Sequence, residues 1–153
     1  MTVLDRLYAP NEVAARFFDS LQPLAALAAR WYVSWQFWKS GYLKITAWST
    51  TLSLFETEYH TPFLPPHVAA VAGTFGELFF PALLALGLAG RLSALGLFAV
   101  NAVAVISYRE VLLAEGFEAA LGQHLLWGSL LALLIVYGPG KLSLDALLRG
   151  SRI

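Results

Sequence analysis

Four long apolar stretches divide the chain, and short, more polar segments separate them. The stretches cover residues 21–43, 67–90, 92–108 and 119–137. A helix needs roughly 20 mostly apolar residues to cross the hydrocarbon core of a bilayer. Because that core offers no water to unpaired backbone groups, such segments cross it as helices. The pattern predicts an all-α membrane protein in which residues 1–153 form a single bundle of four transmembrane helices.

Proline and glycine mark the ends of the predicted helices. Pro65 and Pro66 precede the second stretch, and proline in the first turn of a helix loses no backbone hydrogen bond. Little more than Ala89-Gly90-Arg91 separates the second stretch from the third, which predicts a tight antiparallel hairpin. The fourth stretch ends at Gly138-Pro139-Gly140, where glycine ends a helix and proline cannot continue one.

Shorter elements are expected at both ends of the bundle. Asn11 is suited to cap a short helix over residues 12–21 that lies on the membrane surface. Residues 142–148 repeat this arrangement after the last span, with Ser143 as the cap. The segment from Ile45 to Pro66 is rich in aromatic residues and threonine. For this segment we expect an ordered outer loop with a short helix over the mouth of the bundle.

The composition agrees with a membrane protein and excludes other classes of function. Hydrophobic residues make up 58% of the chain and charged residues 13%, whereas soluble domains carry about 25% charged residues. Ten basic residues balance ten acidic ones, so no basic surface for nucleic acid is expected. The absence of cysteine removes disulfides and thiol chemistry. The lipid bilayer is therefore the first predicted partner.

The basic residues predict the orientation of the bundle in the membrane. Cytoplasmic loops carry an excess of lysine and arginine. One side of the predicted bundle holds Lys39, Lys44 and Arg109. The other side holds six basic residues: Arg6, Arg16, Arg91, Lys141, Arg149 and Arg152. Both termini are therefore expected in the cytoplasm.

Four polar side chains lie well inside the apolar stretches, one in each stretch. Arg30, Glu77, Asn101 and His124 each lie in a different span. An ionisable residue at the centre of a membrane helix costs ~2.5–3.5 kcal/mol, and such residues usually face the bundle interior and mark functional sites. Alternating helix directions put the four residues at similar depths. The simplest arrangement is an ion pair between Arg30 and Glu77, with Asn101 and His124 satisfying the remaining donors and acceptors.

Helical spacing places the polar residues of the first span on one face. Residues three and four positions apart share a helix face, and this relation joins Arg30, Ser34, Phe37, Gly41 and Lys44. A second stripe holds the aromatic residues Trp31, Trp35, Trp38 and Tyr42, which is typical of interface anchoring and packing. On the second span, Gly73 and Gly76 let a neighbouring helix approach closely. The polar face is thus predicted to point inward.

Metal and haem sites find little support in the sequence. Glu56 and His60 are four positions apart, and His67 lies on the same side, but acidic loop residues are usually only solvated. We therefore assign no metal site. A haem held by two histidines within the membrane is not expected, because only His124 lies at depth. No glycine-rich phosphate loop or Ser/His/Asp arrangement is found.

Four motifs stand in order along the chain: Arg30-x10-Gly41-x2-Lys44, Glu77, Gly87-x3-Arg91 and the ending Gly138-Pro139-Gly140-Lys141-Leu142-Ser143-Leu144-Asp145. In these motifs the chain resembles the DoxX family of small bacterial membrane proteins. The resemblance covers residues 21–148. It implies a multi-pass four-helix protein of the bacterial inner membrane. It also implies an association with membrane oxidoreductase systems, including subunits similar to a thiosulfate:quinone oxidoreductase, and with oxidative-stress complexes. The lack of cysteine departs from cysteine-bearing members of the family.

Two functional hypotheses follow. The first is the membrane subunit of a redox system, rather than a self-sufficient enzyme, with a quinone between its helices. Arg30 and Glu77 would orient or protonate a quinone oxygen and His124 would relay protons, as the catalytic groups. The quinone ring and the route to water would involve four further residues: Trp31, Asn101, Trp127 and Lys44. The alternative is a non-catalytic scaffold, assembly factor or small-solute transporter in which the polar cluster is structural. Other protein subunits, or further copies of the chain, are the expected protein partners.

Overall fold

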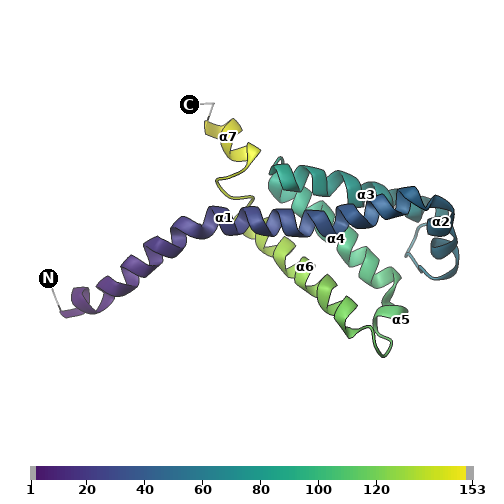
Figure 1. Cartoon of the computed structure of the whole chain (residues 1–153), viewed down its shortest axis with the longest axis horizontal. Helices are drawn as coiled ribbons and strands as arrows, with labels where there is room; N and C mark the ends of the chain where they lie inside the picture. The colour runs from purple at the N-terminus through teal and green to yellow at the C-terminus, as the bar shows by residue number, and fades with distance from the viewer. Residues whose placement is uncertain (1–2, 151–153) are drawn as a thin grey trace.

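The described part of the chain is all helical. The computed structural model describes residues 3–150, with side chains from residue 11 onward. Within this range there are seven helices and no strand (Figure 1): α1 (Val3–Thr46), α2 (Trp48–Thr57), α3 (Pro66–Leu86), α4 (Gly90–Ser107), α5 (Arg109–Leu112), α6 (Glu118–Tyr137) and α7 (Leu144–Gly150). Two of the basic residues on which the predicted orientation rests lie outside this description. For Arg6 the side chain is not described, and Arg152 lies beyond residue 150.

Three of these helices, α3, α4 and α6, are long and apolar enough to cross a membrane. Their bounds lie within a few residues of the predicted spans. The remaining predicted span lies in α1, which is not among the candidates because it mixes Arg30 and Lys39 with tryptophan, tyrosine and serine. α1 nevertheless packs along α3, and α3 packs on α4, which packs on α6.

α1 is one continuous helix, so the prediction of a separate short helix over residues 12–21 was wrong. The physical reason is the lack of a helix stop. Residues 11–40 contain no glycine and only one proline, Pro23, which the helix accommodates without ending. Asn11 therefore lies inside the helix rather than at its cap. In Figure 1 the N-terminal part of α1 projects away from the other helices.

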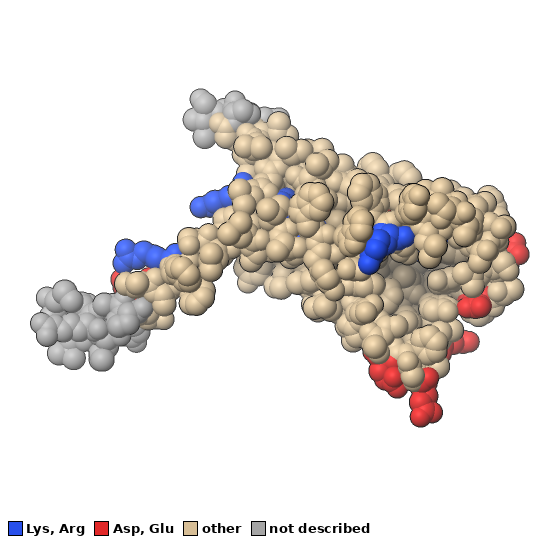
Figure 2. Space-filling view, in the orientation of Figure 1, with Lys and Arg blue, Asp and Glu red and all other residues tan. Residues whose placement is uncertain are grey.

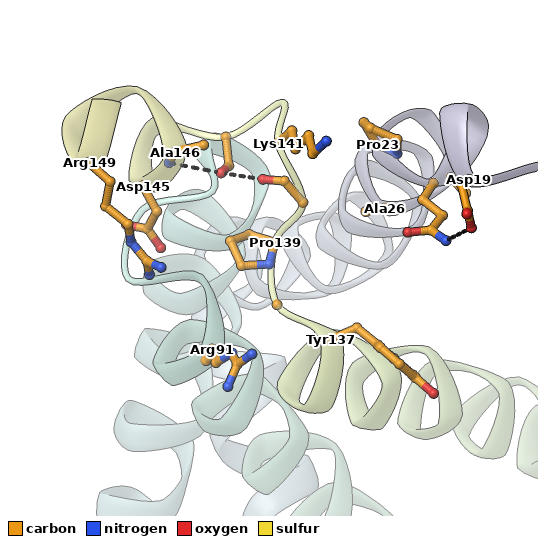
Figure 3. A pocket seen from close by; sticks show the side chains of 15 residues that line it. Asp19, Pro23, Ala26, Arg91, Tyr137, Pro139, Lys141, Asp145, Ala146 and Arg149 are labelled. Atoms are coloured by element: carbon orange, nitrogen blue, oxygen red, sulfur yellow. Dashed lines mark hydrogen bonds between the residues drawn. The ribbon is translucent and has the colours of Figure 1, made fainter. Parts of the chain in front are cut away.

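The other predicted turns and caps agree with the structure. Pro66 begins α3, and α3 ends at a left-handed Gly87 with φ 69°, which leaves a short turn before α4. α6 ends at Gly138 with φ 87°. Ser143 caps α7 as predicted, because its hydroxyl accepts a hydrogen bond from the backbone N–H of Ala146 at 3.2 Å (Figure 3). Helix ends were thus readable from glycine, proline and serine.

The predicted helix in the outer loop is α2. It packs against the first turns of α3, where Phe55 lies in a small cluster with Ala69 and Ala70. α2 and α5 lie at one end of the molecule, and α7 lies at the other, as does the N-terminal part of α1 (Figure 1). We call these the α2 end and the α7 end.

Apolar side chains fill the centre and also cover the outside. The main core consists of Val33, Phe37, Leu84, Ala94, Leu97, Leu131 and Leu134. Figure 2 shows carboxylates gathered mainly at the α2 end and basic side chains toward the α7 end and part-way along α1, with a broad uncharged belt between them. A soluble protein rarely exposes so large an apolar surface, whereas lipid covers it in a membrane.

Candidate functional site

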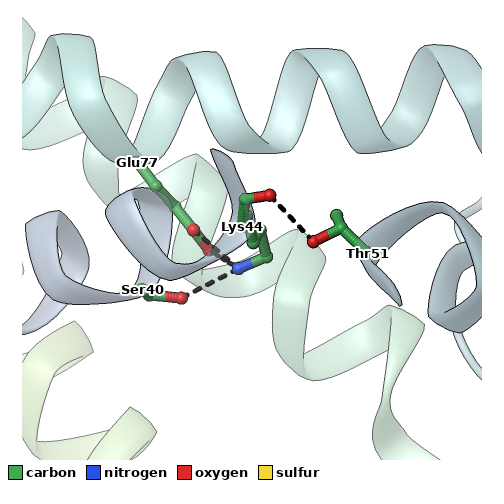
Figure 4. Close-up of polar contacts among 4 residues, drawn as sticks. All are labelled: Ser40, Lys44, Thr51 and Glu77. Atoms are coloured by element: carbon green, nitrogen blue, oxygen red, sulfur yellow. Dashed lines mark hydrogen bonds and ion pairs between the residues drawn. The ribbon is translucent and has the colours of Figure 1, made fainter. Parts of the chain in front are cut away.

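The centre of the site is an ion pair between α1 and α3. Lys44 Nζ lies 2.6 and 2.8 Å from the two carboxylate oxygens of Glu77 and 2.8 Å from the hydroxyl oxygen of Ser40 (Figure 4). An ammonium has three N–H donors, so all three are used. The hydroxyl of Thr51 on α2 donates to the backbone carbonyl of Lys44, which links α2 to the part of α1 that carries the ion pair. Ser40 and Lys44 are four residues apart, which puts both on one helix face.

The predicted pairing of Arg30 with Glu77 is therefore wrong. Arg30 lies 14 positions before Lys44 on α1, which corresponds to roughly 21 Å along a helix. The pairing assumed that all spans begin at the same depth. In fact the first turns of α3 extend beyond the end of α1 and are covered by α2, so Glu77 lies beside Gly41 and Lys44.

Arg30 instead joins the C-terminal segment to the hairpin between α3 and α4. Its Nη2 donates to the backbone carbonyl of Leu142 at 2.5 Å. A Cβ atom on Gly87 would come within 1.8 Å of Arg30 Nη1, so only glycine fits there. Asp145 completes the junction, because its carboxylate accepts backbone N–H bonds from Ala89 and Gly90 at 2.9 and 2.7 Å. Arg30 is buried, with 1% of its surface exposed, and holds the α7 end together.

His124 and Asn101 form a second polar pair, between α6 and α4. Asn101 Nδ2 donates to the backbone carbonyl of His124 at 3.0 Å, which fixes the amide so that its oxygen points at His124 Nδ1, 2.8 Å away. An amide oxygen only accepts hydrogen bonds. We therefore assign the proton of a neutral His124 to Nδ1. Nε2 is then an acceptor, and no hydrogen bond to it occurs within the described residues.

A cavity of about 400 Å³ joins these groups, and we call it the central cavity. Lys44, Glu77 and His124 all line it, as do the hydroxyl-bearing Ser40, Tyr59 and Tyr108. Small residues on the facing helices make the hollow: Ala69, Ala72 and Gly73 on α3, and Gly96, Ala99 and Ala104 on α4. At one end the ring of Phe80 packs on Gly96, where even a Cβ atom would lie 2.3 Å from the ring. The volume falls within the ~300–1,000 Å³ typical of small-molecule sites.

The central cavity reaches the apolar outside of the molecule. Ala72 on α3 and Ala99 and Val103 on α4 line it and are also exposed. By helical spacing they continue the exposed stripes of Phe75 on α3 and Leu95 on α4. The wall of the cavity between α3 and α4 is therefore continuous with the apolar outside of the molecule.

Aromatic rings cover the cavity at the α2 end. Phe55, Tyr59 and Tyr108 stack in a row, with ring centres 4.6 and 4.8 Å apart. Tyr108 donates to a carboxylate oxygen of Glu58. Burial, with the neighbouring Tyr108 and acidic groups, raises the pKa of Tyr59 to about 12. Tyr59 therefore remains a neutral hydroxyl at the mouth of the cavity.

The other predicted site residues divide between core and surface. Trp127 packs edge-on against Phe37 and His124, behind the cavity wall. Trp31 is 56% exposed on the outer face of α1 and does not line the cavity. The polar stripe of α1 points inward as predicted, whereas all four residues of its aromatic stripe are exposed. Among the described residues, no three metal-binding side chains come together.

Sequence reasoning missed Ser40, Tyr59 and Tyr108. Ser40 could have been found, because it precedes Lys44 by one helical turn. The two tyrosines could not, since Tyr59 lies outside the predicted spans and Tyr108 is the last residue of one, and they reach the cavity only through the folding of the segment after α2 and the end of α4.

Comparison with known proteins agrees with the resemblance in the sequence. The DoxX family profile matches residues 25–110. An uncharacterised protein of Haemophilus influenzae is 30% identical over 133 residues, covering 82% of this chain and 84% of that protein. No solved structure matches. The matched region contains the Lys44–Glu77 pair, Arg30 and Asn101. The chain belongs to the DoxX family.

Proposed function

We propose that this protein is a membrane subunit of a redox system that binds a quinol or quinone in the central cavity. The proposal includes a single domain that crosses the bacterial inner membrane four times, with both termini in the cytoplasm. The observation that carries it is the cavity itself. Ionisable groups from three helices meet in an apolar-walled space that is open to the lipid-facing surface.

The packing of α1 supports a fourth membrane crossing. α1 lies along α3, which is long and apolar enough to cross a membrane. The ionisable side chains on its inward stripe, Arg30 and Lys44, have partners inside the protein. Four crossings put both ends of a chain on one side of the membrane. This agrees with the arrangement in Figure 1, where the N-terminal part of α1 and α7 share one end.

The ionisable side chains Lys44, Glu77 and His124 of the cavity favour the reduced form, a quinol. All three donors of Lys44 are used, so it offers none to a ligand. His124 Nε2 and the free lone pairs of Glu77 remain as acceptors. A quinol presents two O–H donors, whereas a quinone presents only acceptors. We therefore infer that His124 Nε2 accepts a hydrogen bond from one quinol hydroxyl and is positioned to take its proton.

Electrons released by such a ligand would pass to a redox centre of a partner subunit. The chain has no cysteine, and of the two histidines within candidate spans, His67 lies in the first turn of α3, which leaves His124 as the one at depth. The role of this chain is therefore binding and proton transfer. Glu77, which is 7% exposed, would accept the second proton with Lys44 holding its carboxylate in place.

A cavity-filling variant tests the proposal. The full chain, purified in mild detergent and freed of lipid, is titrated with decylubiquinol while tryptophan fluorescence is followed. Ala104→Leu places a larger side chain in the cavity and should weaken binding at least about tenfold. Ala132→Leu is the matched control, because Ala132 is exposed on α6 and does not line the cavity. Equal binding by both variants would refute the assignment of this cavity.

One observation favours the alternative of a non-catalytic scaffold. The hydrogen bonds of Lys44 are complete without any ligand, so the pair already links α1 to α3. A scaffold needs this link and nothing more. One measurement separates the two functions, namely the cellular role of a variant that has lost the Lys44–Glu77 pair but keeps its fold. A scaffold keeps its role in such a variant, whereas a quinol-binding subunit loses it.

A further inference from the structure

A second, larger cavity lies at the α7 end, and we call it the terminal cavity. Its volume is about 1020 Å³, and it lies between α1, the turn after α6, the start of α4 and α7. α4 begins and α6 ends beside it, and both helices are long and apolar enough to cross a membrane. The terminal cavity therefore lies where the hydrocarbon core gives way to lipid headgroups.

Three basic side chains line the terminal cavity. Arg91 comes from the first turn of α4, Lys141 from the turn after α6, and Arg149 from α7 (Figure 3). All three are exposed. Within residues 11–150 none of them forms an ion pair or a hydrogen bond through its side chain. Their charges are therefore available to a ligand.

The two carboxylates on the cavity do not neutralise these charges directly. Both oxygens of Asp145 accept backbone N–H bonds, from Ala89 and Gly90. Asp19 accepts a hydrogen bond from Gln22 at 2.6 Å. The lining is thus positive by one charge in total, and its basic groups are the ones without partners. An anionic group fits this arrangement.

Apolar surface lies directly beside the basic groups. Pro23 and Ala26 of α1 and Pro139 form one part of the wall. A free inorganic anion would not pack against this apolar surface, whereas the glycerol and upper acyl chains of a phospholipid would. Basic pockets at the ends of membrane helices bind anionic headgroups in this way.

We propose that the terminal cavity binds the phosphate headgroup of an anionic phospholipid. Lys141 and Arg149 pair with the phosphate and Arg91 lies beside them, while the acyl chains run along α1 past Pro23 and Ala26. This site is independent of quinol binding, because it shares no lining residue with the central cavity.

Native mass spectrometry of the delipidated full chain tests the proposal, with phosphatidylglycerol and phosphatidylethanolamine added in turn. The test variant is Lys141→Gln with Arg149→Gln. The control is Lys39→Gln with Arg109→Gln, which removes two exposed basic residues that do not line the cavity. We expect wild type to retain phosphatidylglycerol in preference to phosphatidylethanolamine. We expect its affinity to fall about tenfold or more in the test variant and less than twofold in the control.

Three results would overturn the proposal. Equal retention of the two lipids by wild type would show that headgroup charge is not recognised. Equal weakening in the test and control variants would place the lipid elsewhere. Displacement of phosphatidylglycerol by millimolar inorganic phosphate alone would show a free-anion site. Circular dichroism of both variants, expected to match wild type, confirms that the exposed substitutions leave the fold intact.

Discussion

The Lys44–Glu77 pair allows the structural and chemical roles of the site to be separated by one set of variants. Glu77→Leu leaves an ammonium among apolar walls, and Lys44→Met leaves a carboxylate there. The double variant Lys44→Met with Glu77→Leu removes both charges. The single variants should be much less stable than the double variant, while all three should lose quinol binding.

The structure sets the magnitude of this effect. Breaking a fully buried ion pair costs ~3–5 kcal/mol, whereas replacing both partners with apolar residues is often nearly neutral. The side chains of Lys44 and Glu77 retain 17% and 9% exposure, so water relieves part of the penalty. We expect each single variant to lose about 2 kcal/mol of unfolding free energy and the double variant about 1 kcal/mol. The coupling energy is then about 3 kcal/mol, the sum of the single losses minus the double loss.

Equilibrium unfolding in mixed micelles with increasing denaturing detergent, followed by tryptophan fluorescence, measures these free energies. Losses that simply add in the double variant would show that the two side chains do not interact as the structure has them. A stable double variant that retains quinol binding would show that the Lys44–Glu77 pair is not needed to bind the quinol.

Three further predictions follow from the same contacts. Arg30→Leu releases the carbonyl of Leu142 and should speed amide hydrogen exchange across residues 138–150 while changing quinol affinity less than twofold. Asn101→Leu frees His124 to carry its proton on either nitrogen and should weaken quinol binding about tenfold, since one oriented hydrogen bond is worth ~1–1.5 kcal/mol. Tyr59 should ionise only near pH 12, visible as a late rise in tyrosinate absorbance that Tyr59→Phe removes. Because its pKa is raised in the fold, the stability from neutral Tyr59 is present below pH ~10 and is lost as the pH rises through about 12.

Each of these predictions has a result that contradicts it. Unchanged hydrogen exchange in Arg30→Leu would mean that the C-terminal segment does not depend on the guanidinium. Full quinol affinity in Asn101→Leu would show that quinol binding does not depend on the tautomer assigned to His124. A tyrosinate titration complete near pH 10 would show that Tyr59 is exposed to water rather than stacked under Tyr108.

The helix ends could be predicted because single residues determine them. Pro66 begins a helix, Gly138 adopts positive φ where α6 ends, and Ser143 accepts an N–H bond, whereas α3 ends at Gly87, a few residues before the predicted turn. The inward face of α1 was likewise predictable, since helical spacing alone decides which of its residues share a side. The similar depths of Asn101 and His124 were also predictable, but their hydrogen bond to each other, rather than to an Arg30–Glu77 pair, depends on the packing of α4 on α6.

The partner of Glu77 could not be predicted, because it depends on how far one helix slides along another. Nothing in the sequence shows that α2 folds back over the first turns of α3 and leaves Lys44, rather than Arg30, beside Glu77. The central cavity was hidden for a related reason. Small residues such as Gly73 and Ala104 produce either close helix packing or a hollow, and the relative position of the helices decides which.

The most direct test of the central claim is whether the protein retains a quinol or quinone when it is purified. Native expression, extraction in mild detergent and chromatographic quantification of bound quinone should give close to one molecule per chain for wild type. The Ala104→Leu variant should retain almost none, and Ala132→Leu should match wild type. The absence of quinone from wild type, or equal amounts in all three proteins, would contradict the proposed role of the central cavity.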